Sequence, residues 1–211
     1  MRRDGEPAPG EPAQGEASAS LGYDAIADRF DAARGPKPWE WRLFEELAAV
    51  LPAGAAVLDC GCGSGHLGLA PLLARGCRIQ GVDGSAAMLA LFSRRYATVP
   101  VRCCDMRQFE PAEPFDAIIA WDSLFHLTQA DQARMLKRFG KWLLPGGRLI
   151  FTSGPSCGSV TGDMFGTPFR YWSLDEAGYR DLLAEHEFVN VSCCFDEPAG
   201  DNHRVWTAAK R

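Results

Sequence analysis

The sequence has no excess of positive charge and no long run of apolar residues. Its 22 Lys and Arg residues are outnumbered by 27 Asp and Glu residues, which gives a formal net charge of -5. No overall field therefore attracts nucleic acid or an anionic membrane surface. No stretch approaches the roughly 18 uninterrupted apolar residues of a transmembrane helix. We therefore expect neither nucleic acid nor a membrane as a partner.

The eight cysteines lack the spacing of a metal site. Cys60-x-Cys62, Cys103-Cys104 and Cys193-Cys194 are not the CxxC pairs that hold zinc, so we expect no bound metal. Residues 1–20 lack the apolar segment of a secretion signal, and their Gly, Pro, Ala and Glu content predicts a disordered tail. We expect residues 21–211 to form one domain in the cytoplasm, where the thiols stay reduced and act mainly as small packing residues.

Strand-like and helix-like segments alternate after the tail. Two helical segments, Tyr23 to Phe30 and Trp39 to Leu51, come first and are separated by a Gly-Pro-Lys-Pro breaker. The strand-like runs are Ala56–Cys60, Arg78–Val82, Val101–Cys104, Phe115–Trp121 and Gly147–Ser153. The helix-like segments between them are Gly65–Ala74, Ala86–Tyr96 and Gln129–Leu144. This alternation predicts a parallel sheet with helices on both faces.

The C-terminal region breaks the alternation. A helical segment, Ser173 to His186, is followed by two strand-like runs, Val189 to Phe195 and Val205 to Ala209, with a short polar loop between them. Two consecutive strands joined in this way predict an antiparallel hairpin. We therefore expect a Rossmann-like α/β fold with a mostly parallel seven-stranded sheet that ends in an antiparallel hairpin.

Acidic residues end three of the predicted strands, and glycines follow the first. Asp59, Asp83 and Asp105 lie one strand-helix unit apart, and Gly61, Gly63 and Gly65 come directly after Asp59. Ligands of open α/β sheets bind at the carboxyl ends of the strands. Glycines let the backbone turn sharply beside a ligand, and a carboxylate can accept hydrogen bonds from ribose hydroxyls. The pattern predicts one cleft for a nucleoside-containing cofactor.

Four motifs in this order resemble those of the class I S-adenosylmethionine-dependent methyltransferases. Val57 to Gly65 resembles the first motif, and Val82-Asp83-Gly84-Ser85 through Met88 resembles the second. Cys104-Asp105-Met106 and Leu144-Pro145-Gly146-Gly147 are similar to the later ones. The resemblance implies the class I methyltransferase fold, S-adenosyl-L-methionine as cofactor, and methyl transfer to an O, N or S atom of a small molecule.

The resemblance also implies roles for individual residues. Asp59 and the backbone of Gly61 would hold the methionine end, and Asp83 would hold the ribose. Met88 would pack on the adenine, with Asp105 and Met106 at its polar edge. The complete set of implied cofactor residues is Tyr23, Asp59, Gly61, Gly63, Asp83, Gly84, Met88, Asp105, Met106 and Trp121.

Two alternatives stay open. Gly63-Ser64-Gly65-His66-Leu67-Gly68 matches the GxGxxG pattern of NAD(P)-dependent oxidoreductases, with Asp83 following it. The acid before the glycines, the terminal hairpin and the lack of a Tyr-x-x-x-Lys pair favour a methyltransferase. A non-catalytic protein that binds S-adenosylmethionine is the second alternative.

The segment after the fourth strand points to a small-molecule acceptor. It reads Asp122-Ser123-Leu124-Phe125-His126-Leu127 and contains neither an Asn/Asp-Pro-Pro-Tyr motif nor a Pro-Cys nucleophile. His126 is the candidate catalytic base because a neutral imidazole can accept a proton near pH 7. Asp122 would orient it or balance charge. A histidine here can instead cap a turn or pack against the cofactor.

Aromatic residues indicate where the acceptor would lie. Gly154 to Trp172 is rich in Gly, Pro, Ser and aromatic residues and is expected to be a loop that covers the site. The candidate substrate residues are Trp39, Phe125, Tyr171 and Trp172; the same rings would suit a small satellite core. His203 is expected to face solvent. The sequence is compatible with a monomer or a homodimer.

Overall fold

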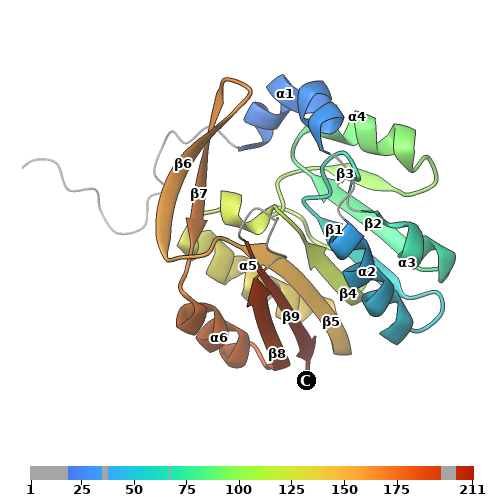
Figure 1. The fold of residues 1–211 in the computed structure, drawn as a ribbon. Helices are drawn as coiled ribbons and strands as arrows, with labels where there is room; N and C mark the ends of the chain where they lie inside the picture. Colours follow the sequence, from blue (N-terminus) through green and yellow to red (C-terminus); the bar gives the residue numbers. More distant parts are fainter. Residues whose placement is uncertain (1–18, 35–37, 67, 196–202) are drawn as a thin grey trace, which may run out of the picture.

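The structure is a computed structural model that describes residues 19–34, 38–66, 68–195 and 203–211 (Figure 1). Two helices, α1 (Ala19–Ala33) and α2 (Pro38–Val50), precede the first strand, as predicted. The predicted tail over residues 1–20 lies outside the described residues except for Ala19 and Ser20, which belong to α1. The helical region therefore begins slightly earlier than the sequence pattern indicated.

A seven-stranded sheet forms the centre of the molecule, in the order β3-β2-β1-β4-β5-β9-β8. The first five strands pair in parallel, whereas β9 runs antiparallel to both β5 and β8. This arrangement confirms the predicted fold and differs from an all-parallel dinucleotide-binding sheet. The strand bounds are β1 Ala56–Cys60, β2 Arg78–Asp83, β3 Val101–Cys103, β4 Phe115–Ala120, β5 Leu143–Ser153, β8 Phe188–Phe195 and β9 Arg204–Lys210.

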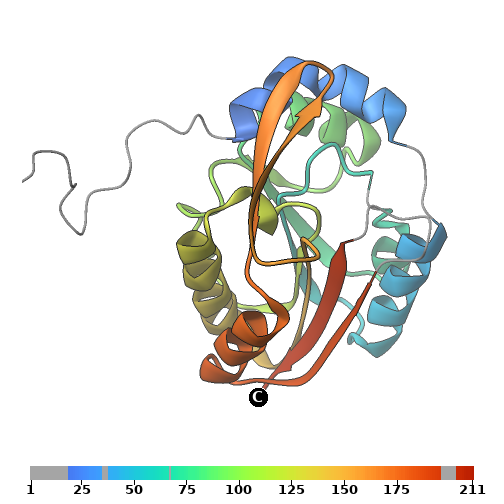
Figure 2. The same ribbon diagram turned by 60° about the vertical axis from the view of Figure 1, so that its left-hand side comes forward.

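Helices cover both faces of the sheet (Figure 2). On one face Val57 and Ile79 pack with α2, α3 (Ala70–Ala74) and α4 (Ala86–Arg95). On the other, Leu58 and Ile118 pack with α5 (Gln129–Trp142) and α6 (Glu176–Glu185). Because consecutive strand residues point to opposite faces, one apolar run supplies both cores. The strand order reverses at β1 and β4, which creates a crevice at their carboxyl ends.

The glycine-rich segment shortens one predicted helix. Helix α3 begins at Ala70 instead of Gly65, because Gly65 and Gly68 have φ values of +77° and +73°. A left-handed residue cannot continue a right-handed helix. Helices α2, α4, α5 and α6 are shorter than predicted by one to three residues at an end, whereas α1 is longer: α5, for example, ends at Trp142, directly before β5. Helix α6 starts after Asp175, whose side chain accepts a hydrogen bond from the N–H of Gly178.

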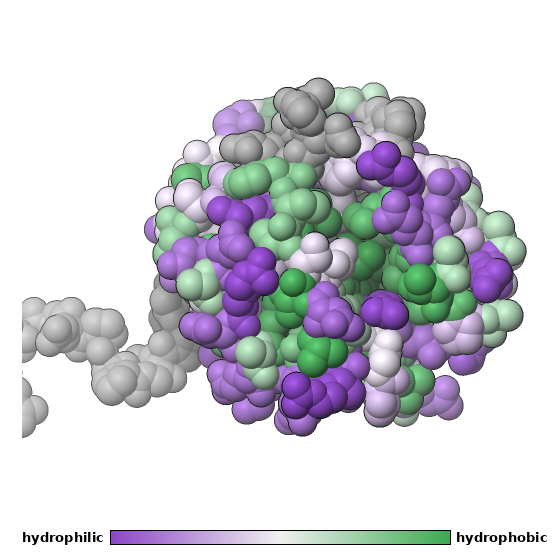
Figure 3. All heavy atoms as spheres, turned by 60° about the horizontal axis from the view of Figure 1, so that its bottom comes forward, coloured by the Kyte–Doolittle hydropathy of each residue, from purple (hydrophilic) through white to green (hydrophobic). Residues whose placement is uncertain are grey.

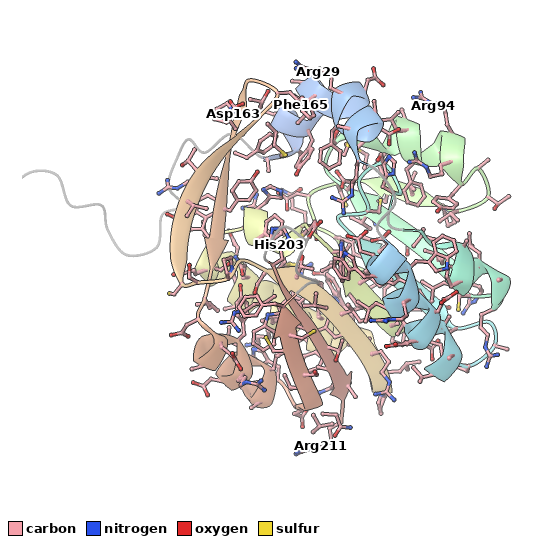
Figure 4. The ribbon with its side chains drawn as sticks, viewed as in Figure 1. Arg29, Arg94, Asp163, Phe165, His203 and Arg211 are labelled. Carbon is pink, nitrogen blue, oxygen red and sulfur yellow. The ribbon has the colours of Figure 1, made fainter. Side chains whose placement is uncertain are left out.

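A β-hairpin replaces the expected covering loop. Strands β6 (Gly158–Met164) and β7 (Thr167–Ser173) pair with each other and form a separate two-stranded sheet. The two residues between them, Phe165 and Gly166, have φ values of 55° and 82°. Two consecutive positive φ values are the requirement of a tight type I′ hairpin turn. The hairpin extends from the sheet up to α1, and Figure 4 places Phe165 at its tip next to Arg29.

The described surface is of mixed character. Figure 3 shows hydrophobic side chains near the middle of one face with hydrophilic side chains around them. In the described ranges, no helix combines the length and apolarity needed to cross a bilayer. Cys60, Cys62 and Cys77 are buried, but Cys103, Cys157 and Cys194 are exposed. The prediction that cysteines serve as packing residues therefore holds for only part of the set.

Candidate active site

The loop after β1 is shaped by glycines that no other residue can easily replace. Gly61 has a φ of +82°, and a Cβ atom at this position would lie 2.3 Å from Cβ of Ser123. The N–H groups of Gly61 and Cys62 both donate to the carbonyl oxygen of Val82. The loop is therefore fastened to β2 on one side and pressed against the segment after β4 on the other.

Asp59 is a buried carboxylate without a partner. Its residue is 1% exposed, and neither carboxylate oxygen has a hydrogen-bond partner among the described residues. Burial, with a smaller contribution from the negative charge of Asp83, raises the pKa of Asp59 to about 7. Buried polar groups are almost always hydrogen-bonded, so this exception needs an explanation.

Asp83 is held by backbone amides at the end of β2. Its two carboxylate oxygens accept hydrogen bonds from the N–H groups of Gly63 at 2.9 Å and Ser85 at 2.8 Å. Burial raises the pKa of Asp83, and these hydrogen bonds oppose that shift. Gly84 follows, and a Cβ atom there would lie 2.1 Å from the hydroxyl oxygen of Ser20. The first turn of α1 thus lies directly over the end of β2.

Two methionines and a third carboxylate continue the site toward β3. Met88 is buried on α4, and the methyl carbon of Met106 lies 3.3 Å from the position of a Cβ at Gly61. The carboxylate of Asp105 is bound through both oxygens by the guanidinium of Arg107. Burial alone would raise the pKa of Asp105, but the hydrogen bonds from Arg107 hold it below its ordinary value. The orientation of Asp105 is therefore fixed by its neighbour.

Tyr23 of α1 and His126 form a pair across the crevice. The phenol oxygen lies 3.0 Å from Nε2 of His126, and the two rings meet edge to face at a centroid distance of 5.4 Å. Burial raises the pKa of Tyr23 and lowers the pKa of His126 to about 4. Near pH 7 the tyrosine is therefore protonated and the histidine is neutral.

Asp122 has many partners. Its carboxylate accepts a hydrogen bond from Arg34 at 2.9 Å and one from the Thr152 hydroxyl at 3.2 Å, and Nδ1 of His203 lies 3.2 Å away. Its backbone N–H donates to Oγ1 of Thr152, and its φ is 45°. Although burial raises it, hydrogen bonds and charges from His203 and Arg34 hold the pKa of Asp122 well below its ordinary value.

His203 is therefore placed differently from the prediction. Instead of facing solvent, its side chain is 23% exposed and paired with Asp122. Figure 4 shows it in the middle of the molecule, at the start of β9. The residue lies 81 positions from Asp122 along the chain, so no local sequence pattern indicated the contact.

Helix α1 is tied to the crevice at further points. Asp24 accepts hydrogen bonds from the Ser85 hydroxyl at 2.6 Å and the Ala87 N–H at 3.0 Å. Asp31 lies 2.9 Å from Nε2 of His66 and 3.2 Å from Nη1 of Arg95. These contacts attach α1 to the glycine-rich loop and to α4, so the helix forms a roof over the crevice.

These elements enclose a cavity of about 680 Å³. This lies within the range of about 300–1,000 Å³ typical of small-molecule sites. Its wall includes the predicted residues Tyr23, Asp59, Gly61, Gly63, Asp83, Gly84, Met88, Asp105, Met106, Trp121, Asp122, His126 and Trp172. The sequence therefore predicted many of the residues that the fold brings together.

Three residues predicted for the acceptor pocket lie behind this wall. Trp39 packs on Trp121 at a centroid distance of 5.5 Å, as part of the core beneath α2. The ring of Phe125 packs between Tyr171 and His203 at 5.6 and 5.1 Å. These positions match the satellite-core alternative, in which the rings support the wall.

Other wall residues were not anticipated from the sequence. Arg34, at the end of α1, contacts both Asp122 and Glu40, and Glu40 accepts a hydrogen bond from the buried indole of Trp121. The hairpin contributes side chains from both strands, including Thr161 and Thr167. Alternating apolar residues from Thr167 to Trp172 were the available signal for the strand, and the Gly and Pro content obscured it.

Known proteins share this architecture. The family model described as "Methyltransferase domain" matches residues 57–147. A dTDP-4-amino-2,3,4,6-tetradeoxy-D-glucose N,N-dimethyltransferase of Saccharopolyspora spinosa is 30% identical over 129 residues, which are 57% of this chain and 51% of the relative. A ubiquinone biosynthesis O-methyltransferase of Bradyrhizobium sp. (strain ORS 278) is 31% identical over 118 residues, 53% of this chain and 46% of the relative. The chain therefore spans about half the length of these curated relatives.

A solved structure extends the likeness to nearly the whole chain. The Burkholderia thailandensis 1,6-didemethyltoxoflavin-N1-methyltransferase, with bound 1,6-didemethyltoxoflavin and S-adenosylhomocysteine, has a TM-score of 0.66 and 24% identity. The match covers 95% of this chain and 93% of that one. At this identity the likeness shows the fold alone. The family match and the strand order agree with it.

Residues 57–147 match the methyltransferase domain family, and the chain has the fold of the class I methyltransferases. The matched segment runs from β1 to the first part of β5, and so includes the glycine-rich loop, Asp59, Asp83, Asp122 and His126. Helix α1, the β6–β7 hairpin and β9 lie outside it. The family match therefore does not cover the roof of the cavity or the hairpin side of its wall.

Proposed function

We propose that this protein transfers a methyl group from S-adenosyl-L-methionine to an O, N or S atom of a small-molecule acceptor. The observation that carries the proposal is the buried carboxylate of Asp59, which has no described partner beside the cavity. An unpaired buried acceptor destabilises the protein unless a ligand supplies the donor. The ammonium group at the methionine end of the cofactor is such a donor.

The neighbouring residues fit the rest of this cofactor. Asp83 would accept hydrogen bonds from the ribose hydroxyls beneath Ser20, and Met88 and Met106 provide apolar surface for the adenine. When bound, S-adenosylmethionine supplies a methyl group that is already activated on its sulfonium. The protein's own task is then to hold the acceptor in line with that methyl group and to exclude water.

We propose positioning and proton-handling roles for the Tyr23–His126 pair. A histidine with a pKa of about 4 is neutral throughout the physiological range, so its Nε2 can accept the hydrogen bond of the Tyr23 hydroxyl, and the Tyr23 oxygen can in turn accept one from the accepting atom. The same low pKa makes it a weak base, because general-base catalysis is most efficient when the pKa lies near the working pH. Asp122 would fix the segment that carries His126.

The relatives support a small-molecule acceptor. Their names describe methyl transfer to an amino sugar and in ubiquinone biosynthesis, and the excess of acidic residues in this chain disfavours nucleic acid. We propose that residues 21–211 act as one methyltransferase domain in the cytoplasm, without a membrane partner, as a monomer or homodimer.

Calorimetric titration with S-adenosylmethionine, S-adenosylhomocysteine and NADH tests the cofactor directly. We expect saturable binding of the first two and none of NADH; the reverse pattern would refute the proposal. Release of S-adenosylhomocysteine with a panel of small acceptors then tests catalysis, since a binding protein without transferase activity releases none.

The role of His126 has its own test. His126→Gln keeps a hydrogen-bonding side chain but cannot take a proton, so we expect turnover to fall while cofactor affinity stays within about twofold. Unchanged turnover across the pH range would remove His126 from the mechanism. Tyr23→Phe is the matched variant on the other side of the pair.

A further inference from the structure

One end of the cavity is built from flat rings. Tyr23 and Phe30 of α1 meet at a centroid distance of 5.4 Å, and Tyr23 lies 4.8 Å from the ring of Phe169 on β7. Phe169 is 3% exposed, and all three rings belong to the cavity wall together with Trp172. Large aromatic surfaces of this kind favour stacking or edge-to-face contact with another ring.

The charged groups at this end already have partners. The carboxylate of Asp122 is engaged by Arg34, Thr152 and His203. The guanidinium of Arg34 also contacts Glu40 at 3.4 Å. A carboxylate whose oxygens already face a guanidinium, a hydroxyl and an imidazole has few positions left for a positively charged ligand. Within the described part of this wall, Asp122 is the acidic group on the side of His126, so an ammonium ion would enter without a free counter-charge.

Arg170 of β7 also lies at this end of the cavity. Its guanidinium carbon lies 5.1 Å from the ring centre of Trp172. Its Nη2 donates to the Ser159 hydroxyl at 3.5 Å. The guanidinium packed near Trp172 therefore extends the flat surface at this end of the cavity.

The polar groups that remain are neutral. The Tyr23 hydroxyl and Nε2 of His126 hydrogen-bond to each other at 3.0 Å, and the hydroxyls of Thr161 and Thr167 come from the hairpin. A ring hydroxyl or ring nitrogen can join this pair as a donor or an acceptor. An aliphatic amine, which carries a proton near pH 7, would have to give it up first.

We propose, on the basis of the proposed function, that this methyltransferase binds a planar aromatic or heteroaromatic acceptor whose accepting atom is uncharged. The wall formed by Tyr23, Phe30, Phe169 and Trp172 would hold the ring, and the Tyr23–His126 pair would contact the accepting atom. The β6–β7 hairpin is then the part of the chain that determines acceptor class.

The test uses full-length protein saturated with S-adenosylhomocysteine and measures acceptor binding instead of turnover. The aromatic probes are 8-hydroxyquinoline and lumazine; the controls are cyclohexylamine, which is cationic, and cyclohexanol, which is neutral but not flat. We expect the better aromatic probe to bind at least tenfold more tightly than either control. Tighter binding of cyclohexylamine would overturn the inference. Equal binding of cyclohexanol would also overturn it, because ring stacking would then not determine the affinity.

Variants on the hairpin localise the effect. Phe169→Leu removes the ring but keeps an apolar side chain, and we expect it to weaken binding of the aromatic probe about fivefold. Phe165→Ala is the matched control, because Phe165 is 42% exposed at the tip of the same hairpin and outside the wall. Trp172→Leu is a second test on the same strand, and thermal unfolding verifies that each variant is folded. Unchanged affinity in both wall variants would overturn the inference.

The two proposals fail separately. If S-adenosylhomocysteine does not bind the wild-type protein, the proposed function is wrong. If it binds but neither aromatic probe is preferred over the controls, the proposed function stands and the acceptor class is wrong. Titrating S-adenosylhomocysteine into Phe169→Leu verifies that the cofactor end is unaffected, with an expected change of less than twofold.

Discussion

The two ends of the cavity are built in opposite ways. At the end of β1, Asp59 is buried with no described partner, whereas at the end of β4 Asp122 is engaged by Arg34, Thr152 and His203. A missing partner marks a place where a ligand completes the structure. A carboxylate with several partners marks a scaffold that is complete before any ligand arrives. The comparison therefore separates Asp59, which would bind a ligand, from Asp122, which holds neighbouring side chains in place.

The contrast extends to protonation. Burial raises the pKa of Asp59 to about 7, while His203 and Arg34 outweigh burial and hold the pKa of Asp122 well below its ordinary value. Asp122 is thus ionised wherever the protein is folded, and the charge of Asp59 changes near neutral pH. The two ends should respond to pH in opposite directions.

The largest expected effect comes from adding a side chain at Gly61, where the loop after β1 contacts the segment after β4. Gly61→Ala places a Cβ 2.3 Å from Cβ of Ser123 at a left-handed residue, so we expect a loss of about 2–4 kcal/mol in the free energy of unfolding. Gly63→Ala is the control, since its Cβ would meet only the methyl carbon of Met88 at 3.5 Å, and it should lose about 1 kcal/mol. Urea denaturation measures both.

A second substitution distinguishes crowding from backbone strain. Ser123→Gly removes the atom that a Cβ at Gly61 would strike, but it also removes the hydrogen bond from the Ser123 hydroxyl to the Cys60 carbonyl oxygen. If crowding is the cause, the loss in the double variant should be smaller than the sum of the two single losses. If the two losses simply add, the contact between the two loops is not the cause.

Removing the charge of Asp122 should have the next largest effect. Asp122→Asn keeps a residue that tolerates the observed φ of 45°, but it leaves Arg34 and His203 without the carboxylate. We expect a loss of about 2 kcal/mol at pH 7, less than for a fully buried pair because the Asp122 side chain is 17% exposed. Because its pKa is depressed in the folded state, this contribution is fully present above the ordinary carboxyl pKa of about 4 and is lost progressively as the pH falls below it toward the lower folded-state pKa.

Wild-type and variant stability should therefore converge in acid. Denaturation at a series of pH values from 7 down to about 3 measures the difference. A gap that stays constant over this range would mean that the ion pairs do not supply the stability.

Asp59→Asn should change stability in the opposite sense. Because the pKa of Asp59 is raised in the folded protein, its protonated form favours folding, and that stability is lost as the pH rises through about 7. Without the charge, the cofactor-free variant should be more stable than wild type at pH 8 by on the order of 1 kcal/mol or more, with little difference at about pH 4, near the ordinary carboxyl pKa. Thermal unfolding at the two pH values checks this.

The same variant should bind the cofactor less well. Loss of a charge-assisted hydrogen bond predicts at least about tenfold weaker binding of S-adenosylhomocysteine at pH 8. The wild-type affinity should rise with pH toward and through 7, and that of the variant should be nearly flat. A variant that is less stable than wild type and binds equally well would reverse the assignment of Asp59 as a ligand-binding group.

The end of the cavity around Asp59 was easier to predict from the sequence than the end around Asp122. Asp59, the glycines and Asp83 lie within one strand-helix-strand unit, where parallel pairing of β1 with β2 follows from the alternation of elements. The partners of Asp122 come from distant parts of the chain: Arg34 is 88 residues away and His203 is 81. Neither lies in a motif, and only the complete fold brings them together.

The hairpin was missed for a local reason. Its turn uses Phe165-Gly166, while the common signals for a type I′ turn are Asn-Gly and Asp-Gly. Phe165 adopts a φ of 55°, which is unfavourable for a bulky residue. Its pairing from Gly158 to Ser173 and the Arg29 guanidinium 5.6 Å from its ring centre hold it there. Tertiary contacts therefore override the local preference.

The smallest expected effect separates the contributions of His203 and Arg34 to holding Asp122. The pair with His203 spans 3.2 Å between partly exposed side chains, so a double-mutant cycle of His203→Ala with Asp122→Asn should give a coupling of about 0.5 kcal/mol. The cycle of Arg34→Met with Asp122→Asn should give about twice that, because its contact is shorter, at 2.9 Å, and the guanidinium is always charged. Equal couplings would make His203 as important as Arg34 in holding the acceptor end together, and a coupling of zero for His203 would leave Arg34 and Thr152 as the groups that complete it.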